Sequence, residues 1–249
     1  MPLGDVRRFY VEPGTVRGRQ VALGPEAAHR LGRVLRLRSG QHLVLFDGSG
    51  REWEVELKSV GPKGLTAVVV QEVAPPPEPH VHLTLLAGLT KEPRFEVLLE
   101  KATELGVAEI VPVVTRRSVV RPWKEGAKQE RWRRIVIEAT EQCERARPPR
   151  LHTPLPLPQA LRLADGLRVV PWEEEQSLGL RQLLRGLTEA PRQVSVLVGP
   201  EGGLEPQEVE MARGAGFAVV TLGPRILRAE TAAIVACALV MHELGELGP

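Results

Sequence analysis

From residue 81 onward, short apolar runs alternate with longer segments of helical periodicity, and this alternation is the strongest constraint on the fold. The apolar runs are "VHLTLLAGL" at 81–89, "EIVPVV" at 109–114, "LRVVPW" at 167–172, "VSVLVG" at 194–199 and "AVVTLG" at 218–223. The helical segments lie at 93–106, 128–146, 178–187, 206–216 and 226–244. Runs that are apolar on both faces and are separated by helices are typical of a parallel sheet covered on two sides. We therefore predict an α/β domain over residues 81–249.

The first 72 residues follow a different pattern, in which short β-like runs are separated by turns. In "HLVLFDGSGREWEVELKSV" at 42–60, the "DGSG" stretch indicates a hairpin loop. A short helix is predicted at 25–37, because Pro25 is well suited to a first helical turn. The segment "VAPPPEPH" at 73–80 can continue neither a helix nor a central strand. We predict a small β-barrel domain over 1–72, joined by this linker to the α/β domain.

Charge is distributed unevenly along the chain. The net charge is only +2, but residues 1–46 contain eight arginines against Asp5, Glu12 and Glu26, an excess of five positive charges. This basic segment indicates a polyanionic partner, although a solvated surface would explain it equally well.

The overall composition excludes several classes of protein. A hydrophobic fraction of 43% with no apolar run of membrane-spanning length excludes a disordered or membrane-spanning chain. The N-terminus has no apolar signal-peptide core, so a cytoplasmic location is expected. The two cysteines lack metal-ligand spacing and are expected to be free thiols.

Three of the predicted strands end in unusual turns. One stops at Pro171 and Trp172, and two others stop at Gly-Pro pairs, Gly199–Pro200 and Gly223–Pro224. Glycine lets backbone approach a ligand closely and proline stiffens the turn. Ligands of open α/β sheets bind beyond the carboxyl ends of the strands, so we predict one site built from these three loops.

Several familiar sites are excluded by their missing motifs. "GPEGG" at 199–203 lacks the Gly-Lys-Ser/Thr ending of a phosphate-binding loop, and no G-x-G-x-x-G follows the first α/β strand. No cluster of cysteine and histidine supports a metal site, so no metal is expected. Ser118 and Ser195 lack a nearby histidine, which removes the basis for a hydrolase triad.

Four motifs together resemble those of a known family. They are "EKATELGV" at 100–107, "EATEQC" at 138–143, "LVGPEGG" at 197–203 and "LGPRILRAETA" at 222–232. The chain resembles, over nearly its whole length, the ribosomal RNA small subunit methyltransferase E family of the SPOUT superfamily. The chain departs from the family pattern at Glu144 and Ala146, where the family commonly has Gly and Asn.

The resemblance implies a fold and an activity. The expected fold is α/β, a parallel-sheet SPOUT domain with a deep C-terminal trefoil knot and a PUA-like N-terminal barrel that binds RNA. The expected reaction transfers a methyl group from S-adenosylmethionine to N3 of a uridine in 16S rRNA. The expected partners are this RNA or the small ribosomal subunit, and a second copy of the chain in a homodimer, with no membrane.

The resemblance also implies roles for particular residues. The cofactor would be held by Pro171, Trp172, Gly199, Pro200, Glu201, Gly203, Leu222, Gly223, Arg225, Leu227, Arg228 and Ala229. Arg228 and Glu230 would be catalytic, the arginine by stabilising the negative charge that develops on uracil. The RNA-binding residues would be Arg7, Arg8, Arg30, Arg33, Lys91 and Arg94. Glu201 is expected to accept backbone N–H groups and so to order its loop.

Alternatives remain open at this stage. Arg228 and Glu230 could simply form an ion pair at the start of a helix, and Phe9 and Tyr10 could pack in the core rather than stack on bases. The chain could be a SPOUT methyltransferase with another RNA target, such as a tRNA ribose 2′-oxygen. It could also be a non-catalytic RNA-binding protein with the same fold.

Overall fold

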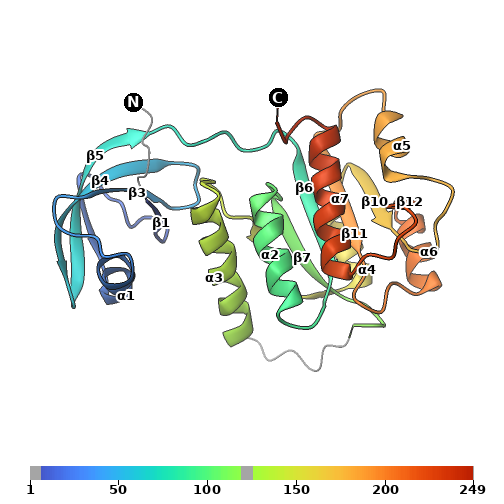
Figure 1. Cartoon of the computed structure of the whole chain (residues 1–249), viewed down its shortest axis with the longest axis horizontal. Helices are drawn as coiled ribbons and strands as arrows, with labels where there is room; N and C mark the ends of the chain where they lie inside the picture. The colour runs from blue at the N-terminus through green and yellow to red at the C-terminus, as the bar shows by residue number, and fades with distance from the viewer. Residues whose placement is uncertain (1–6, 119–125, 249) are drawn as a thin grey trace. The chain divides into compact units, whose positions relative to one another are not determined.

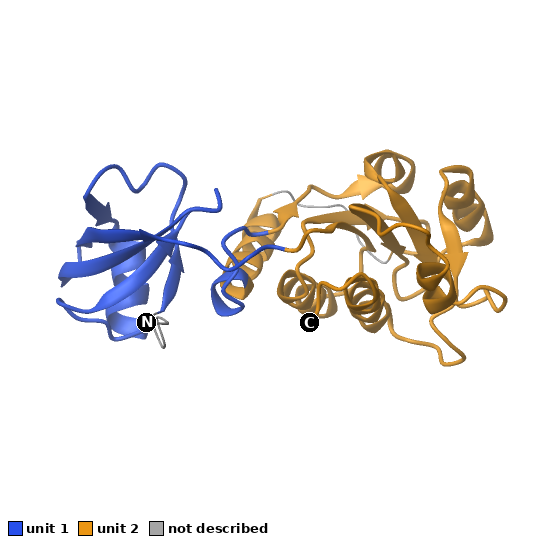
Figure 2. Cartoon of the chain, turned by 90° about the horizontal axis from the view of Figure 1, so that it is seen from above, with its two compact units in different colours: residues 1–78, 140–148 blue, residues 79–139, 149–249 orange. Residues whose placement is uncertain are grey.

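The computed structural model describes residues 7–118 and 126–248 (Figure 1), and these residues form two compact units. The first unit comprises residues 1–78 together with 140–148, and the second comprises 79–139 and 149–249 (Figure 2). The sequence did not indicate that residues 140–148 join the first unit. Glu141 of this segment accepts a hydrogen bond from the Tyr10 backbone N–H at 2.9 Å.

The first unit is a curled five-stranded sheet with one helical segment. Its strands are β1 (Arg8–Tyr10), β2 (Gln20–Leu23), β3 (His42–Phe46), β4 (Glu52–Gly61) and β5 (Gly64–Val73), in the order β1-β3-β4-β5-β2. Strands β3 and β4 pair antiparallel around the predicted "DGSG" loop. The predicted helix is α1 (Pro25–Ala28), which continues as a π-helical turn (His29–Val34). Its Leu31 is fully buried with Leu43, Leu45 and Val55 in this unit's core.

The second unit contains a parallel sheet of seven strands within the described residues. The strands are β6 (His82–Gly88), β7 (Glu109–Val114), β8 (Arg150–Leu151), β9 (Leu155–Pro156), β10 (Leu167–Pro171), β11 (Gln193–Val198) and β12 (Ala218–Val220). Their order is β12-β10-β11-β6-β7-β8, with β9 also paired to β7. The short strands β8 and β9 were not predicted.

Helices cover both faces of this sheet, as predicted. The helices are α2 (Arg94–Glu104), α3 (Ala127–Gln142), α4 (Leu157–Ala160, followed by a 3-10 turn at Leu161–Leu163), α5 (Leu180–Arg185), α6 (Pro206–Gly214) and α7 (Ala229–Glu243). Adjacent residues of β6 point to opposite cores, since Leu85 packs with α2, α5 and α7 whereas Leu86 packs with α4 and α6. Burial on both faces explains why the strands are apolar throughout.

The end of β12 is enclosed by the segment that follows β10. On one side, the Val220 carbonyl accepts a hydrogen bond from the Trp172 N–H at 3.0 Å. On the other side, Thr221 donates to the Leu178 carbonyl at 2.8 Å and accepts from the Leu180 N–H at 3.1 Å. Successive residues of a strand point their hydrogen-bonding groups to opposite sides, so the chain after β10 passes around β12. This encirclement is the geometry that the predicted knot requires.

Candidate functional site

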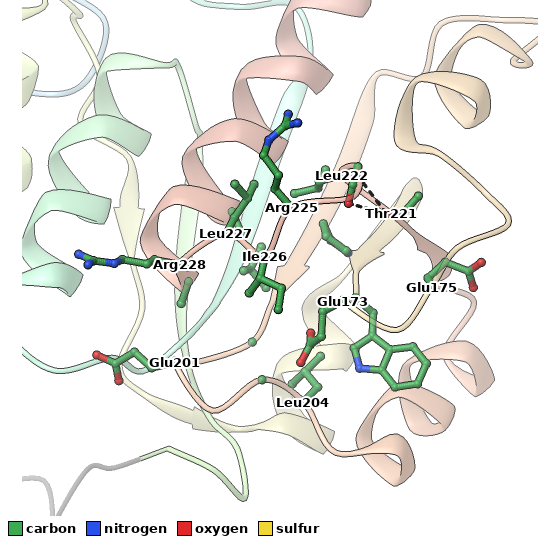
Figure 3. Close-up of a pocket in the computed structure, with 18 of the residues that line it drawn as sticks. Glu173, Glu175, Glu201, Leu204, Thr221, Leu222, Arg225, Ile226, Leu227 and Arg228 are labelled. Atoms are coloured by element: carbon green, nitrogen blue, oxygen red, sulfur yellow. Dashed lines mark hydrogen bonds between the residues drawn. The ribbon is translucent and has the colours of Figure 1, made fainter.

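The three predicted loops meet at one cavity. In the sheet, β10 lies between β12 and β11, so the carboxyl ends of all three strands are adjacent. Beyond them is a cavity of about 750 Å³ (Figure 3). Every residue predicted to hold the cofactor lines this cavity. The convergence is therefore observed, whereas the contact of each residue with a cofactor remains a prediction.

The turn after β11 is braced by its neighbours. Gly203 donates its N–H to the Pro200 carbonyl at 2.9 Å and has a φ of +72°, which favours glycine. Gly88, at the end of β6, packs so closely that an added Cβ would lie 2.7 Å from the Gly199 carbonyl carbon. Arg117 donates to the Gly202 carbonyl at 2.9 Å. The backbone of this turn is consequently held from two sides.

The turn after β12 is open by comparison. An added Cβ at Gly223 would meet no atom within 4 Å. The side chain of Ile226 is 90% exposed, and Arg225 and Arg228 are also exposed. Among residues 7–118 and 126–248, no hydrogen bond or ion pair engages either guanidinium group. These cations are thus available to a ligand.

Arg94 connects the two turns. Its Nη1 donates to Oε1 of Glu201 at 3.0 Å, and its Nε lies 3.8 Å from Oε1 of Glu230. Arg94 also lines the cavity, whereas Glu230 does not. The guanidinium of Arg94 is thus paired with carboxylates of the site, while its side chain stays 41% exposed and its contact with RNA remains a prediction.

The partner found for Glu201 matches expectation, whereas the partner found for Glu230 does not. Glu201 accepts the Lys91 backbone N–H at 3.2 Å, which agrees with its predicted ordering role. Glu230 pairs with Arg94 rather than with Arg228, so the helix-start ion pair is not the arrangement found. In both glutamates Oε2 is buried and has no hydrogen-bond partner in the part of the chain that the structure describes.

The segment after β10 is ordered by Glu175. The Ser177 hydroxyl and backbone N–H both donate to this carboxylate, and the Leu178 N–H lies 3.3 Å away. Arg213 lies 3.5 Å from Oε2. These donors, the Ser177 hydroxyl first, lower the pKa of Glu175 to about 2. The carboxylate thus anchors the segment that encircles β12.

In the first unit, most of the predicted RNA-binding arginines already have partners. Arg8 forms a buried ion pair with Glu52, so its prediction as an RNA contact is not supported. Arg30 pairs with Glu141 and stacks over the ring of Phe9, which is buried in the core. The core-packing alternative for Phe9 is therefore confirmed.

The remaining basic residues are more accessible. Arg7 is exposed and donates to the Leu35 carbonyl at 2.7 Å, while Arg33 and Lys91 are exposed.

Sequence reasoning missed two residues that support the site. Gly88 is a glycine at the carboxyl end of the first strand of the α/β unit. A glycine at the end of a strand was also the feature that pointed to Gly199 and Gly223. Arg117 carries no signal in the sequence, because its contact lies 85 residues away in the chain.

The described residues contain neither a metal-binding cluster nor a helix of membrane-spanning length. Among residues 7–118 and 126–248, there is no group of three His, Cys, Asp or Glu side chains that could hold a metal ion. No helix in the same ranges is long and apolar enough to cross a membrane.

Comparison with known proteins places this geometry in a family. The model of the RNA methyltransferase domain matches residues 76–241, and that of the RNA methyltransferase PUA domain matches residues 23–70. The chain is 34% identical to ribosomal RNA small subunit methyltransferase E of Synechocystis, over 94% of this chain and 76% of that protein. It is 32% identical to the Bacillus subtilis enzyme of the same name, over 96% and 97% of the two chains.

Solved structures agree with these matches. A Legionella pneumophila methyltransferase in complex with S-adenosylmethionine has a TM-score of 0.87 at 33% identity, covering 95% of this chain and 97% of that one. Ribosomal RNA small subunit methyltransferase E of Neisseria gonorrhoeae, bound to the same cofactor, has a TM-score of 0.85 at 31% identity, with the same coverage. The chain therefore belongs to the ribosomal RNA small subunit methyltransferase E family of RNA methyltransferases.

Proposed function

We propose that this protein uses S-adenosylmethionine to methylate N3 of a uridine in 16S rRNA, either free or within the small ribosomal subunit. The observation that carries the proposal is the meeting of three motif-bearing loops at one cavity, which is also lined by Arg228, an arginine without an ion-pair partner among the described residues. The names of the relatives at 30–34% identity support ribosomal RNA as the substrate. A ribosomal substrate would place the reaction in the cytoplasm.

The residues present fit the proposed cofactor. A volume of about 750 Å³ lies within the range of about 300–1,000 Å³ typical of small-molecule sites. The wall combines apolar side chains such as Leu204 and Leu222 with the side-chain-free backbone of Gly199 and Gly223, which suits an adenosyl group. When bound there, S-adenosylmethionine would supply an electrophilic methyl group on a sulfonium.

Arg228 has the properties that the uracil ring requires. Uridine N3 carries a proton at neutral pH, and its loss spreads negative charge over O2 and O4. A guanidinium that no carboxylate already neutralises stabilises that charge as it develops. We assign this role to Arg228, with Arg225 as the second candidate. Glu230 acts as a positioning residue for Arg94, because it does not line the cavity.

The target base must be unpaired or turned outward, since N3 is hidden in a base pair. We propose that Arg7, Arg33 and Lys91 contact the RNA backbone, because all three are exposed. Arg30 contributes less, since Glu141 partly neutralises it.

We further propose a homodimer that covers the outer side of α7. This helix is apolar nearly all round, yet Leu239 remains 37% exposed. Apolar groups on the outer side of a helix favour burial against a partner. Sedimentation equilibrium should give a dimer at micromolar concentration, and Leu239→Glu should shift it to monomer. A monomeric wild-type protein would contradict this part of the proposal.

The decisive experiment for the activity is nucleoside mass mapping of ribosomal RNA from a deletion strain. We expect one 3-methyluridine to disappear and to return when purified protein and S-adenosylmethionine are added. Persistence of that nucleoside, with loss of a ribose methylation elsewhere, would instead support the alternative RNA target. Calorimetric titration with S-adenosylmethionine distinguishes both methyltransferase hypotheses from a non-catalytic RNA-binding protein.

A further inference from the structure

Glu201 lines the cavity and has one carboxylate oxygen without a hydrogen-bond partner among the described residues. Its Oε1 already accepts from the Lys91 N–H at 3.2 Å and from Arg94 Nη1 at 3.0 Å. Its Oε2 is buried and has no hydrogen-bond partner among the described residues, and the residue lines the cavity. A buried carboxylate oxygen without a donor is destabilising, and such an exception calls for an explanation, of which a catalytic role is one. Glu230 has the same feature but does not line the cavity.

The carboxylate is held in a defined position. Arg94 binds it from the start of α2, and Glu230 in turn lies 3.8 Å from the Arg94 Nε. The turn that carries Glu201 is tied to Arg117 through the Gly202 carbonyl. A catalytic group that several contacts orient in this way needs little reorganisation when its substrate arrives.

The surroundings of Glu201 match the edge of uracil. That edge presents the N3–H donor between two carbonyl acceptors, O2 and O4. Glu201 offers a free acceptor with the Arg94 guanidinium bound to it. Arg228, which carries a second guanidinium, also lines the cavity. Figure 3 shows Arg228 and Glu201 on the same side, away from Glu173 and Glu175.

We propose that Glu201 accepts the N3 proton of the target uridine, an inference that rests on the proposed function. The N3–H bond breaks and its proton passes to Oε2 of Glu201. The electron pair left on N3 then forms the bond to the methyl carbon, whose bond to sulfur breaks with its electron pair remaining on sulfur. Glu201 afterwards releases the proton to solvent. Arg94 and Glu230 are positioning residues for this step.

Two matched variants test the proposal, Glu201→Gln and Glu230→Gln. Both remove one carboxylate charge next to Arg94, but only the first alters the cavity wall. We expect Glu201→Gln to lower kcat about 10²–10⁴-fold, the usual contribution of a general base, and Glu230→Gln to lower it roughly tenfold or less. The affinity for S-adenosylmethionine, measured by calorimetry, should stay within about threefold in both variants.

A second measurement needs no cofactor. RNA fragments with uridine or cytidine at the target position are titrated against the protein by fluorescence anisotropy. Cytidine N3 is an acceptor and is repelled by a carboxylate, so wild type should prefer uridine about tenfold. The amide of Glu201→Gln can donate to cytidine, and the preference should fall below about twofold. Glu230→Gln should retain it.

The possible results distinguish an error in the assignment of Glu201 from an error in the proposed function. A Glu201→Gln protein with kcat within about threefold of wild type overturns the proposal. So does a loss of S-adenosylmethionine affinity beyond about tenfold with the uridine preference intact, because the carboxylate then serves the cofactor. If Glu201→Gln does not fold, Glu201→Asp replaces it, and an unchanged kcat in that variant likewise overturns the assignment. A wild-type product other than 3-methyluridine would instead refute the proposed function.

Discussion

The two Gly-Pro turns of the site look alike in the sequence but differ in the structure. Gly199–Pro200 is packed against Gly88, and its loop is bound by Arg117 and Arg94. Gly223–Pro224 has open space around it and leads into a run of exposed residues. The first turn is therefore held by its neighbours, whereas the second leaves Arg225 and Arg228 without a hydrogen-bond or ion-pair partner among the described residues. The same dipeptide serves two purposes, and only its surroundings decide which.

The largest effect that would test this contrast is expected from Arg228→Ala on the open turn. Loss of a group that stabilises developing negative charge should lower kcat about 10²–10³-fold. The Kd for S-adenosylmethionine should change by less than about threefold, because the backbone of the turn is untouched. Single-turnover kinetics and calorimetry measure the two quantities.

Arg225→Ala serves as the matched control, since it removes the same charge from the same turn. A smaller loss of kcat in this variant would assign the role to Arg228. If Arg228→Ala weakened cofactor binding as much as turnover, Arg228 would be a binding residue instead.

A second, intermediate effect concerns the braced turn. In Gly88→Ala the new methyl group would meet the backbone of Gly199 and Pro200, which cannot move easily. We expect the free energy of unfolding to fall by about 3 kcal/mol, at the upper end for an overpacked core. Gly223→Ala meets no atom within 4 Å but has a φ of +113°, so it should lose only about 1 kcal/mol.

Urea denaturation of the two glycine variants measures the difference. Equal losses would mean that the braced and open turns respond alike, and the contrast drawn from packing would be wrong.

Much of the fold could be predicted because it depends on local pattern. Alternating apolar and helical segments indicated the parallel sheet, and strand-ending turns indicated which loops meet. What could not be predicted depends on pairing between distant residues. Arg94 resembled any exposed cation in the sequence, but it binds Glu201, which lies 107 residues further along the chain. Likewise Arg8 is neutralised by Glu52, a strand residue 44 positions away.

The smallest expected effect is a pH dependence of stability, and it arises from Glu175 in the segment that passes around β12. The pKa of Glu175 is lowered to about 2, chiefly by the Ser177 hydroxyl, from an ordinary value near 4.5. A carboxylate with a depressed folded-state pKa contributes stability that is fully present above its unfolded pKa and is lost as the pH falls through the folded value. Wild type should therefore be more stable than Glu175→Gln at pH 6, and the difference should shrink between about pH 4.5 and pH 2.

Thermal unfolding of both proteins across this pH range provides the measurement. Glu174→Gln is the control, because Glu174 is exposed and its replacement removes the same charge one residue away. A difference between wild type and Glu175→Gln that stayed constant down to pH 2 would show that the hydrogen bonds from Ser177 and Leu178 do not depend on the carboxylate's charge. The contribution of Glu175 to the segment around β12 would then be independent of pH, as is the backbone pairing of this segment with Val220 and Thr221.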